Sequence, residues 1–227
     1  MIQERAAAHL TKDRTAARGG FWLIYGATFI HPKRALAQLI TRVDAVAIGA
    51  KAVLLTAALY TLMYGFLTLG GAAPSSFAPW LAIPKAVYYR YNTLMLAPSM
   101  FVCWLLAASV GHLLARAWAG RGSFEQTAAA LGVSISLSSW TTLVHDLTAS
   151  LLGAMHLIDA RAHEAAMNAP TFWRGLILTL FLLYAIAFLY MFSTSIAVSH
   201  RLDRIKSAAL GLLSFIMYQG MFFVFNR

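Results

Sequence analysis

Gly120-Arg121-Gly122-Ser123-Phe124-Glu125-Gln126 is a short polar stretch between two long apolar segments. Glycine is the usual residue just past a helix end, so Gly120 and Gly122 predict that the preceding helix stops here. Ser123 can cap the next helix, Gln126 three positions later completes a capping box, and Glu125 places a negative charge in the first turn, where it suits the helix dipole. The stretch therefore predicts a tight cytoplasmic hairpin between two membrane helices.

The composition of the whole chain is that of an integral membrane protein. Of its 227 residues, 60% are apolar and 11% are charged, whereas a soluble domain carries about 25% charged residues. The net charge of +10 does not indicate nucleic acid as a partner, because basic residues gather in the cytoplasmic loops of membrane proteins. The one cysteine, Cys103, lies in an apolar run and is expected to be a buried packing residue.

Five segments are long and apolar enough to be transmembrane helices. They cover residues 46–69, 93–115, 126–144, 175–198 and 207–225. We expect residues 1–20 to form a polar cytoplasmic tail, without the apolar core of a cleaved signal peptide, and residues 21–227 to form a single membrane domain. The predicted fold is all-α, a bundle of five transmembrane helices with an N-terminal amphipathic interfacial helix.

That amphipathic helix is expected to begin at Pro32, because proline suits the first position of a helix. One face would carry the apolar side chains Leu36, Leu39, Ile40 and Val43. The other faces would carry the polar side chains Lys33, Arg34, Gln38 and Arg42. Such a helix can lie on the inner membrane surface or pack on the bundle as an ordinary cytoplasmic helix, and the sequence leaves both interpretations open.

The third span differs from the others in its small and hydroxyl side chains. Ala128, Gly132 and Ser136 recur at every fourth position, and such a stripe lets neighbouring helices approach closely, so we expect this helix at the centre of the bundle. Its hydroxyl groups indicate either a polar pathway or hydrogen bonds between helices, and the second interpretation is favoured. Residues 147–158 are apolar but too few to span, and they would extend this helix, lie at the interface or re-enter the membrane.

The distribution of Lys and Arg predicts the orientation. With the N-terminus inside, twelve of these residues fall in cytoplasmic segments and five outside, so the N-terminus is predicted to be cytoplasmic and the C-terminus to lie outside. Lys51 is the one charge within a span, near enough to the inner interface to snorkel. The loop after the first span contains aromatic residues that predict a belt at the outer interface, namely Trp80, Tyr88, Tyr89 and Tyr91.

Two motifs give the chain a family resemblance. One is the Pro-containing segment Phe29-Ile30-His31-Pro32-Lys33-Arg34-Ala35-Leu36. The other is the hairpin from Leu113 to Phe124, with Gly120, Gly122, Ser123 and Phe124 at its centre. With five spans and a cytoplasmic N-terminus, the chain resembles the Yip domain family, the Ypt-interacting membrane proteins, over roughly residues 25–225.

The resemblance is closest to the bacterial members of that family, since the sequence lacks the long cytoplasmic N-terminal domain of many eukaryotic members. It implies a multi-pass protein of the bacterial inner membrane. The eukaryotic relatives are linked to Rab-type GTPases and vesicle traffic. The family supplies no catalytic residues to carry over to this chain.

The sequence contains no motif of known catalytic chemistry. It has no phosphate-binding Gly-x-x-x-x-Gly-Lys loop, no Gly-x-Ser-x-Gly and no His-Glu-x-x-His. We therefore expect a non-enzymatic scaffold or interaction partner for other membrane components, in contact with the lipid bilayer and with a membrane-protein partner or a second copy of itself. The alternatives are a small oligomeric transporter or channel, and an intramembrane metalloprotein.

Two groups of ionisable residues are candidate sites. Asp44, Lys51, His112, Arg116 and His200 are expected near the inner face, as interfacial anchors rather than as a proton or anion path. In the predicted outer loop, His156, Asp159 and His163 would lie on one face if 156–163 is helical. They could then hold zinc or another divalent transition metal, with His145 or Glu164 as supporting groups. The alanine-rich segment 160–170 instead favours a solvated loop, so no cofactor is expected and the divalent metal is the alternative.

Overall fold

The computed structural model describes residues 20–74 and 83–226, and within these ranges it contains helices and no strand. The helices are α2 (Phe21–Ile30), α3 (Pro32–Leu39), α4 (Ala45–Leu69), η1 (Lys85–Val87), α5 (Tyr88–Ala117), α6 (Phe124–Ala154), α7 (Ala160–Ala166), α8 (Phe172–His200) and α9 (Arg204–Phe225). The helices α4, α5, α6, α8 and α9 are long and apolar enough to cross a membrane. The predicted all-α, five-span architecture is therefore confirmed, while residues 1–19 of the predicted tail and Trp80 lie outside the described residues.

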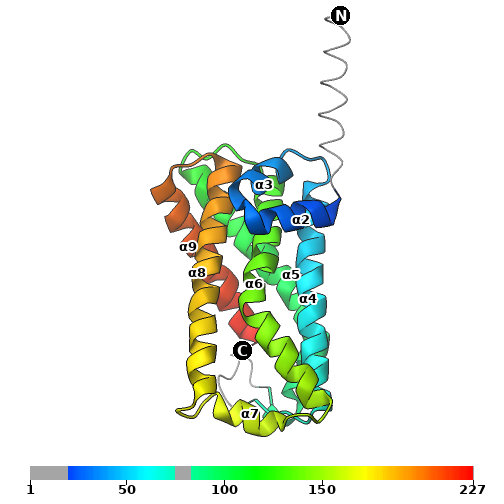
Figure 1. Ribbon diagram of the computed structural model, residues 1–227. Helices are drawn as coiled ribbons and strands as arrows, with labels where there is room; N and C mark the ends of the chain where they lie inside the picture. The colour runs from blue at the N-terminus through cyan, green and yellow to red at the C-terminus, as the bar shows by residue number, and fades with distance from the viewer. Residues whose placement is uncertain (1–19, 75–82, 227) are drawn as a thin grey trace, which may run out of the picture.

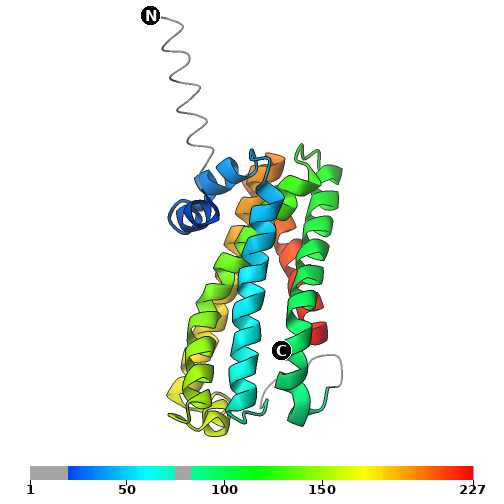
Figure 2. The same cartoon turned by 90° about the vertical axis from the view of Figure 1, so that its right-hand side faces the viewer.

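The five long helices lie side by side, and shorter helices cover the two ends of the bundle (Figure 1). α2 and α3 lie across one end, together with the hairpin of residues 118–123 and the loop of residues 201–203. α7 lies across the opposite end, as the second view also shows (Figure 2). We call these the hairpin end and the α7 end.

The central helix is α6, as the sequence predicts. In the apolar 18-residue stretch of α6, 83% of the residues are buried inside the bundle. In the corresponding stretch of α8, 17% are buried. Small residues make this position possible: a Cβ atom added at Gly132 would lie 2.6 Å from the carbonyl oxygen of Gly49. α4 and α6 therefore meet backbone to backbone, and the stripe of small residues is a packing feature.

The hydroxyl groups of α6 join it to its neighbours. Ser136 Oγ lies 2.8 Å from the Tyr25 hydroxyl of α2 and accepts a hydrogen bond of 2.6 Å from Thr56 of α4. Ser134 Oγ lies 2.7 Å from Ser195 Oγ of α8. These contacts favour the interpretation of the hydroxyl groups as bonds between helices, because Ser134 and Ser136 together reach α2, α4 and α8.

α3 packs on the bundle through a short apolar face. Ala35, Leu36 and Leu39 are buried, while Lys33 and Arg34 are exposed. The helix ends at Leu39, and Val43 is fully exposed in the connection to α4, so the predicted position of Val43 on the apolar face is wrong. Of the two interpretations of this segment, packing against the bundle fits the buried leucines.

Two further features differ from the predicted ones. α6 continues to Ala154, so most of the ambiguous segment 147–158 extends the third helix. Tyr88 and Tyr89 are 1% and 3% exposed, packed against Tyr64, so their assignment to an interfacial belt is wrong; Tyr91, which is 45% exposed, fits it better. α9 ends beside α5, where the Asn226 amide donates to Ser99 Oγ at 3.1 Å.

Candidate functional site

The hairpin end contains the Pro32 segment and the Gly120–Phe124 hairpin, and the predicted capping box is present. The backbone N–H of Gln126 donates to Ser123 Oγ, and the backbone N–H of Ser123 donates to Gln126 Oε1. The amide of Gln126 also donates to the carbonyl oxygen of Ile40, just past α3. One glutamine thus ties the start of α6 to the segment that follows Pro32.

The two glycines of the hairpin serve a purpose that the sequence did not reveal. The residue with left-handed backbone is Ala119, at φ 64°, and not Gly120 or Gly122. A Cβ atom at Gly122 would overlap the carbonyl oxygen of Ser199, and one at Gly120 would lie 2.9 Å from His200 Nδ1. Glycine is required here because the hairpin presses its backbone against the end of α8.

His200 stabilises this contact through hydrogen bonds of both ring nitrogens. Its Nδ1 accepts a hydrogen bond of 3.2 Å from the backbone N–H of Gly122, and its Nε2 lies 2.8 Å from Thr127 Oγ1. The Thr127 hydroxyl donates onward to the carbonyl oxygen of Ser123. This chain of donors requires a neutral imidazole with its proton on Nε2, held between the hairpin and α6.

The five residues predicted to cluster near the inner face are only partly brought together. His112 and His200 have ring centroids 5.3 Å apart, and the backbone of Arg116 lies in the last turn of the same helix as His112. Asp44 pairs with Arg42 at 2.7 Å, and the guanidinium holds the pKa of that carboxyl below its usual value. Lys51 is exposed on α4, so it does not face the bundle interior.

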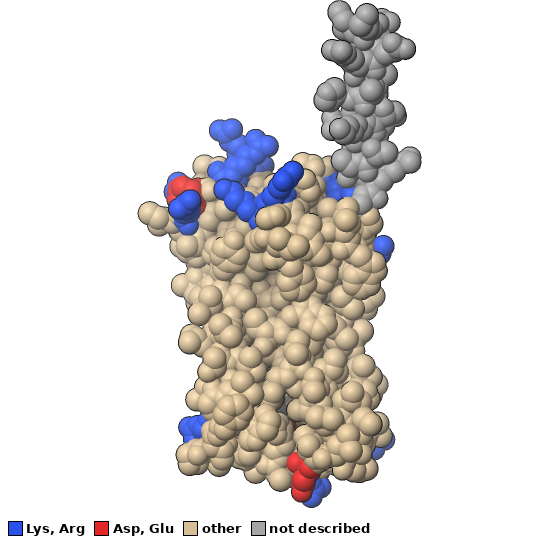
Figure 3. Space-filling view, in the orientation of Figure 1, with Lys and Arg blue, Asp and Glu red and all other residues tan. Residues whose placement is uncertain are grey.

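Basic side chains gather at the hairpin end (Figure 3). In the described ranges this end has eight Lys and Arg residues and three acidic residues. The α7 end has four Lys and Arg residues and three acidic residues. The eight are Lys33, Arg34, Arg42, Arg116, Arg121, Arg201, Arg204 and Lys206. We call them the basic surface, and two of the nearby carboxylates are already engaged: Asp44 by Arg42, and Asp203 by the backbone N–H of Lys206.

At the α7 end the structure contains a cavity of about 320 Å³ between α4, α5, α6, α7 and α8. Its polar lining comes mainly from the ionisable residues His145, Asp146, His163, Glu164 and Arg174, together with Tyr89, Ser150 and Asn168. Its apolar lining includes Met63, Leu67, Ile177, Leu178 and Phe181. We call it the α7-end cavity; its size is at the lower end of the range for small-molecule sites.

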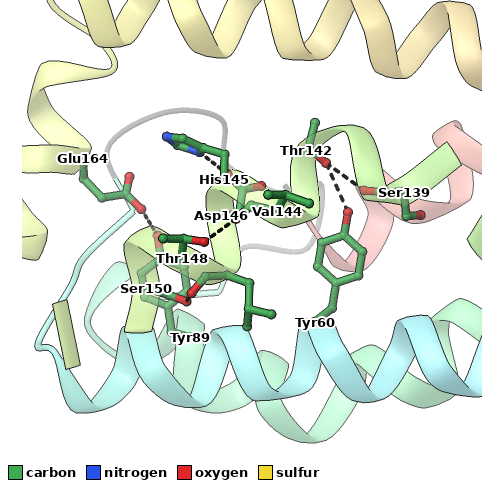
Figure 4. Close-up of polar contacts among 11 residues, drawn as sticks. Tyr60, Tyr89, Ser139, Thr142, Val144, His145, Asp146, Thr148, Ser150 and Glu164 are labelled. Carbon is green, nitrogen blue, oxygen red and sulfur yellow. Dashed lines mark hydrogen bonds and ion pairs between the residues drawn. The ribbon is translucent and has the colours of Figure 1, made fainter. Parts of the chain in front are cut away.

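Two pairs of polar side chains organise this cavity (Figure 4). The Tyr89 hydroxyl of α5 donates a hydrogen bond to Glu164 Oε1 of α7, and Glu164 is 5% exposed. His145 Nδ1 lies 2.8 Å from Asp146 Oδ1 on α6. Three helices therefore contribute to one polar lining; Glu164 is bonded to Tyr89, which is distant in the sequence, whereas Asp146 is bonded to its neighbour His145.

His163 lies beside these pairs, with its ring centroid 4.7 Å from that of Trp173 and 5.7 Å from that of His145. Its Nε2 is buried and has no hydrogen-bond partner. Burial lowers the pKa of His163 below its ordinary value, and the nearby His145 adds to the effect. At neutral pH this imidazole is therefore uncharged and can accept or donate one further hydrogen bond.

The predicted metal set of His156, Asp159 and His163 does not assemble. Its premise, a helix over 156–163, is wrong: α7 begins at Ala160, and His156 has left-handed backbone at φ 57° in the turn before it. Asp159 instead caps α7 by accepting from the backbone N–H groups of Arg161 and Ala162. Among the described residues no three His, Cys, Asp or Glu side chains are placed to hold a metal ion.

Sequence reasoning found part of the cavity. It named His145, His163 and Glu164 among its candidate residues, but it missed the cavity positions of Tyr89 and of the α8 residues Arg174, Ile177, Leu178 and Phe181. The buried position of Tyr89 could not be read from local pattern, since an aromatic residue at a span end also fits an interfacial belt.

Comparison of the chain with protein-family models, with curated proteins and with solved structures returned no match. The arrangement of the molecule's own residues therefore carries the functional argument.

Proposed function

We propose that this chain is a non-enzymatic membrane protein that acts as a scaffold, presenting the basic surface at its hairpin end to anionic lipid and to an acidic membrane partner. The observation that carries the proposal is the concentration of Lys and Arg at that end (Figure 3). Each Lys or Arg close to an anionic leaflet contributes about 1 kcal/mol of attraction. A surface with eight such residues and few free carboxylates suits this role.

The positions of α2 and α3 support contact with lipid. Trp22, Leu23, Phe29 and Ile30 of α2 are 56–73% exposed, while Lys33 and Arg34 of α3 are exposed beside them. Exposed aromatic and aliphatic side chains next to basic ones are typical of a helix that lies in the membrane interface. In this arrangement the hairpin end faces the cytoplasm, since basic residues favour that side.

The proposed location is the bacterial inner membrane, with the N-terminus in the cytoplasm and the C-terminus outside. The resemblance to the Yip family is part of this proposal. It is supported by the spatial neighbourhood of its two motifs: Gln126 after the Gly-x-Gly-Ser-Phe hairpin bonds to Ile40 after the Pro32 segment. In a family of scaffolds with this junction, both motifs would be needed because they are bonded to one another.

The experiment for the lipid contact compares anionic and zwitterionic lipids of the same chain length. Purified protein is titrated with dihexanoyl-phosphatidylglycerol or dihexanoyl-phosphatidylcholine, and thermal unfolding is followed. We expect more stabilisation by the anionic lipid, reduced in Lys33→Gln/Arg34→Gln and retained in the matched variant Lys85→Gln/Arg90→Gln at the α7 end. Equal responses to the two lipids would refute the basic surface as a lipid site.

The experiment for the partner places a photo-crosslinking amino acid at Arg121 or, as the control, at Arg161 of the α7 end. A scaffold should give a stoichiometric crosslinked protein in native membranes from position 121 only, and charge reversal at Arg201 and Arg204 should remove it. Crosslinks of equal yield from both positions, or none from position 121, would contradict the scaffold.

A small transporter is the second candidate function, and the α7-end cavity is the observation that favours it. A transporter would also need a route to the hairpin end, along α6. There the hydroxyl groups of Ser134 and Ser136 bond to Tyr25, Thr56 and Ser195, so these two groups hold helices together and are not left to line a route. Substrate flux into vesicles that contain only this protein would favour transport over the scaffold.

A further inference from the structure

The α7-end cavity has an apolar wall and a polar wall. Ile177, Leu178 and Phe181 of α8 form part of the first, and Asp146 and Glu164 belong to the second. Leu178 and Phe181 are also 57% and 48% exposed on the outer surface of α8, at a depth where that helix is apolar. The cavity therefore borders the lipid-facing surface, where α6 and α8 lie apart near α7 (Figure 1).

The charges around the cavity favour a cation. Its two carboxylates belong to Asp146 and Glu164, and its one permanent cation is Arg174, which is exposed at the rim and donates to the carbonyl oxygen of Asn168. The lowered pKa of His163 leaves that ring neutral, so it does not offset the carboxylates. The Asp146 carboxylate can accept further hydrogen bonds besides the one with His145.

The remaining lining suits an ammonium group with an apolar body. Tyr64, Tyr89 and Phe181 line the cavity, and aromatic rings attract cations. The unpartnered Nε2 of His163 can accept a hydrogen bond from an ammonium N–H. A carboxylate ligand would instead meet Asp146 and Glu164, and like charges in a partly buried site repel.

From these observations we propose that the α7-end cavity binds a monovalent amphipathic organic cation, an alkyl- or arylalkyl-ammonium, which enters from the membrane. The ammonium group lies against Asp146 and Glu164, and the apolar body lies against Ile177, Leu178 and Phe181. This site is independent of the basic surface, which lies at the other end of the bundle.

The test uses three probes with one skeleton: 4-phenylbutylammonium, the neutral 4-phenylbutan-1-ol and the anionic 5-phenylpentanoate. Binding to the full chain in nanodiscs of zwitterionic lipid is measured by calorimetry, with empty nanodiscs subtracted. We expect the ammonium to bind at least about tenfold more tightly than the alcohol, since a hydrogen bond to a charged group contributes more than a neutral one. The carboxylate should bind least.

Three variants assign the binding to this cavity. Asp146→Asn should weaken the ammonium at least about tenfold and leave the alcohol unchanged. Leu178→Trp should block both probes by filling the apolar wall, and Glu125→Gln at the hairpin end should change nothing. Each variant is first checked for monodispersity, and Glu164→Gln replaces Asp146→Asn if the latter fails that check.

Equal binding of ammonium and alcohol would overturn the proposal, and so would tighter binding of the carboxylate. Unchanged ammonium affinity in a well-folded Asp146→Asn or Leu178→Trp variant would place the probe elsewhere and overturn it as well.

Discussion

The two ends of the bundle use their polar groups in different ways. At the hairpin end the backbone N–H groups of Arg121 and Gly122 both bond to His200, and Ser123 and Gln126 satisfy one another. The exception nearby is His112 Nδ1, which is buried without a partner. At the α7 end the ionisable side chains surround a cavity, and His163 Nε2 is unpartnered.

This difference separates residues that determine the fold from residues available for binding. A polar group that is fully bonded within the chain holds the structure, whereas one that faces a cavity can still bind a ligand. The hairpin end therefore constrains the backbone, and the α7 end is the better candidate for binding small molecules. Both statements can be tested by substitution.

The largest effect is expected where backbones touch on the hairpin side of the bundle. Gly132→Leu would push α6 away from Gly49 of α4 and should lower the free energy of unfolding by about 3 kcal/mol or more, if the protein folds. The control is Gly65→Leu on α4, where nothing lies within 4 Å, and it should be neutral or slightly stabilising. Chemical unfolding in detergent measures both, and equal losses would remove the close approach as the explanation.

The second effect tests the hairpin itself. Gly122→Ala adds a Cβ that overlaps the Ser199 carbonyl, so we expect a loss of about 2 kcal/mol in the free energy of unfolding. Arg121→Ala is the matched control, because its bond to His200 comes from the backbone and survives the change. If Gly122→Ala unfolds like the wild type in thermal scans, the hairpin does not constrain the end of α8.

The third effect compares the helix caps of the two ends. Ser123→Ala breaks the capping box of the long, buried α6 and should cost about 1 kcal/mol. Asp159→Ala removes the cap of the seven-residue α7 and should cost about half as much, at the low end of measured caps. A larger loss from Asp159→Ala than from Ser123→Ala would reverse the proposed division between the ends.

The smallest effect is a pH dependence at the α7 end. The pKa of His163 is lowered in the folded state, so below its ordinary value of 6.5 the unfolded chain binds a proton that the folded chain does not. Stability should therefore fall as the pH is lowered from about 7.5 through 6.5 and level off below the folded pKa. In His163→Gln this part of the slope should vanish, while His145, Asp146 and Glu164 remain; identical pH profiles would exclude His163 as the cause.

The sequence predicted the parts of the fold that depend on local pattern. The five spans follow from apolar length, and the capping box of Ser123 and Gln126 follows from two residues at a fixed spacing. The central position of α6 follows from its small residues. Each of these properties belongs to one element and its immediate neighbours along the chain.

The features that sequence reasoning missed depend on contacts across the bundle. The need for glycine at position 122 arises from Ser199, and the site of Glu164 depends on Tyr89, seventy-five residues away. The metal hypothesis failed because it assumed a helix through His156, where the chain turns. Only the packing of α5, α7 and α8 determines which ionisable side chains meet in the α7-end cavity.

The burial of α6 also has a consequence for how the protein enters the membrane. α6 is the least apolar of the five long helices, with a mean hydropathy of 1.3 compared with 2.3 for α8. The transfer of hydroxyl-bearing side chains from water into hydrocarbon releases little free energy. α6 by itself therefore has a weak tendency to partition into lipid. During synthesis it would need α4 and α5 already beside the translocon, so that Thr56 and the small residues of α4 receive it as it leaves the channel. α8, by contrast, is apolar enough to insert independently and close the bundle afterwards.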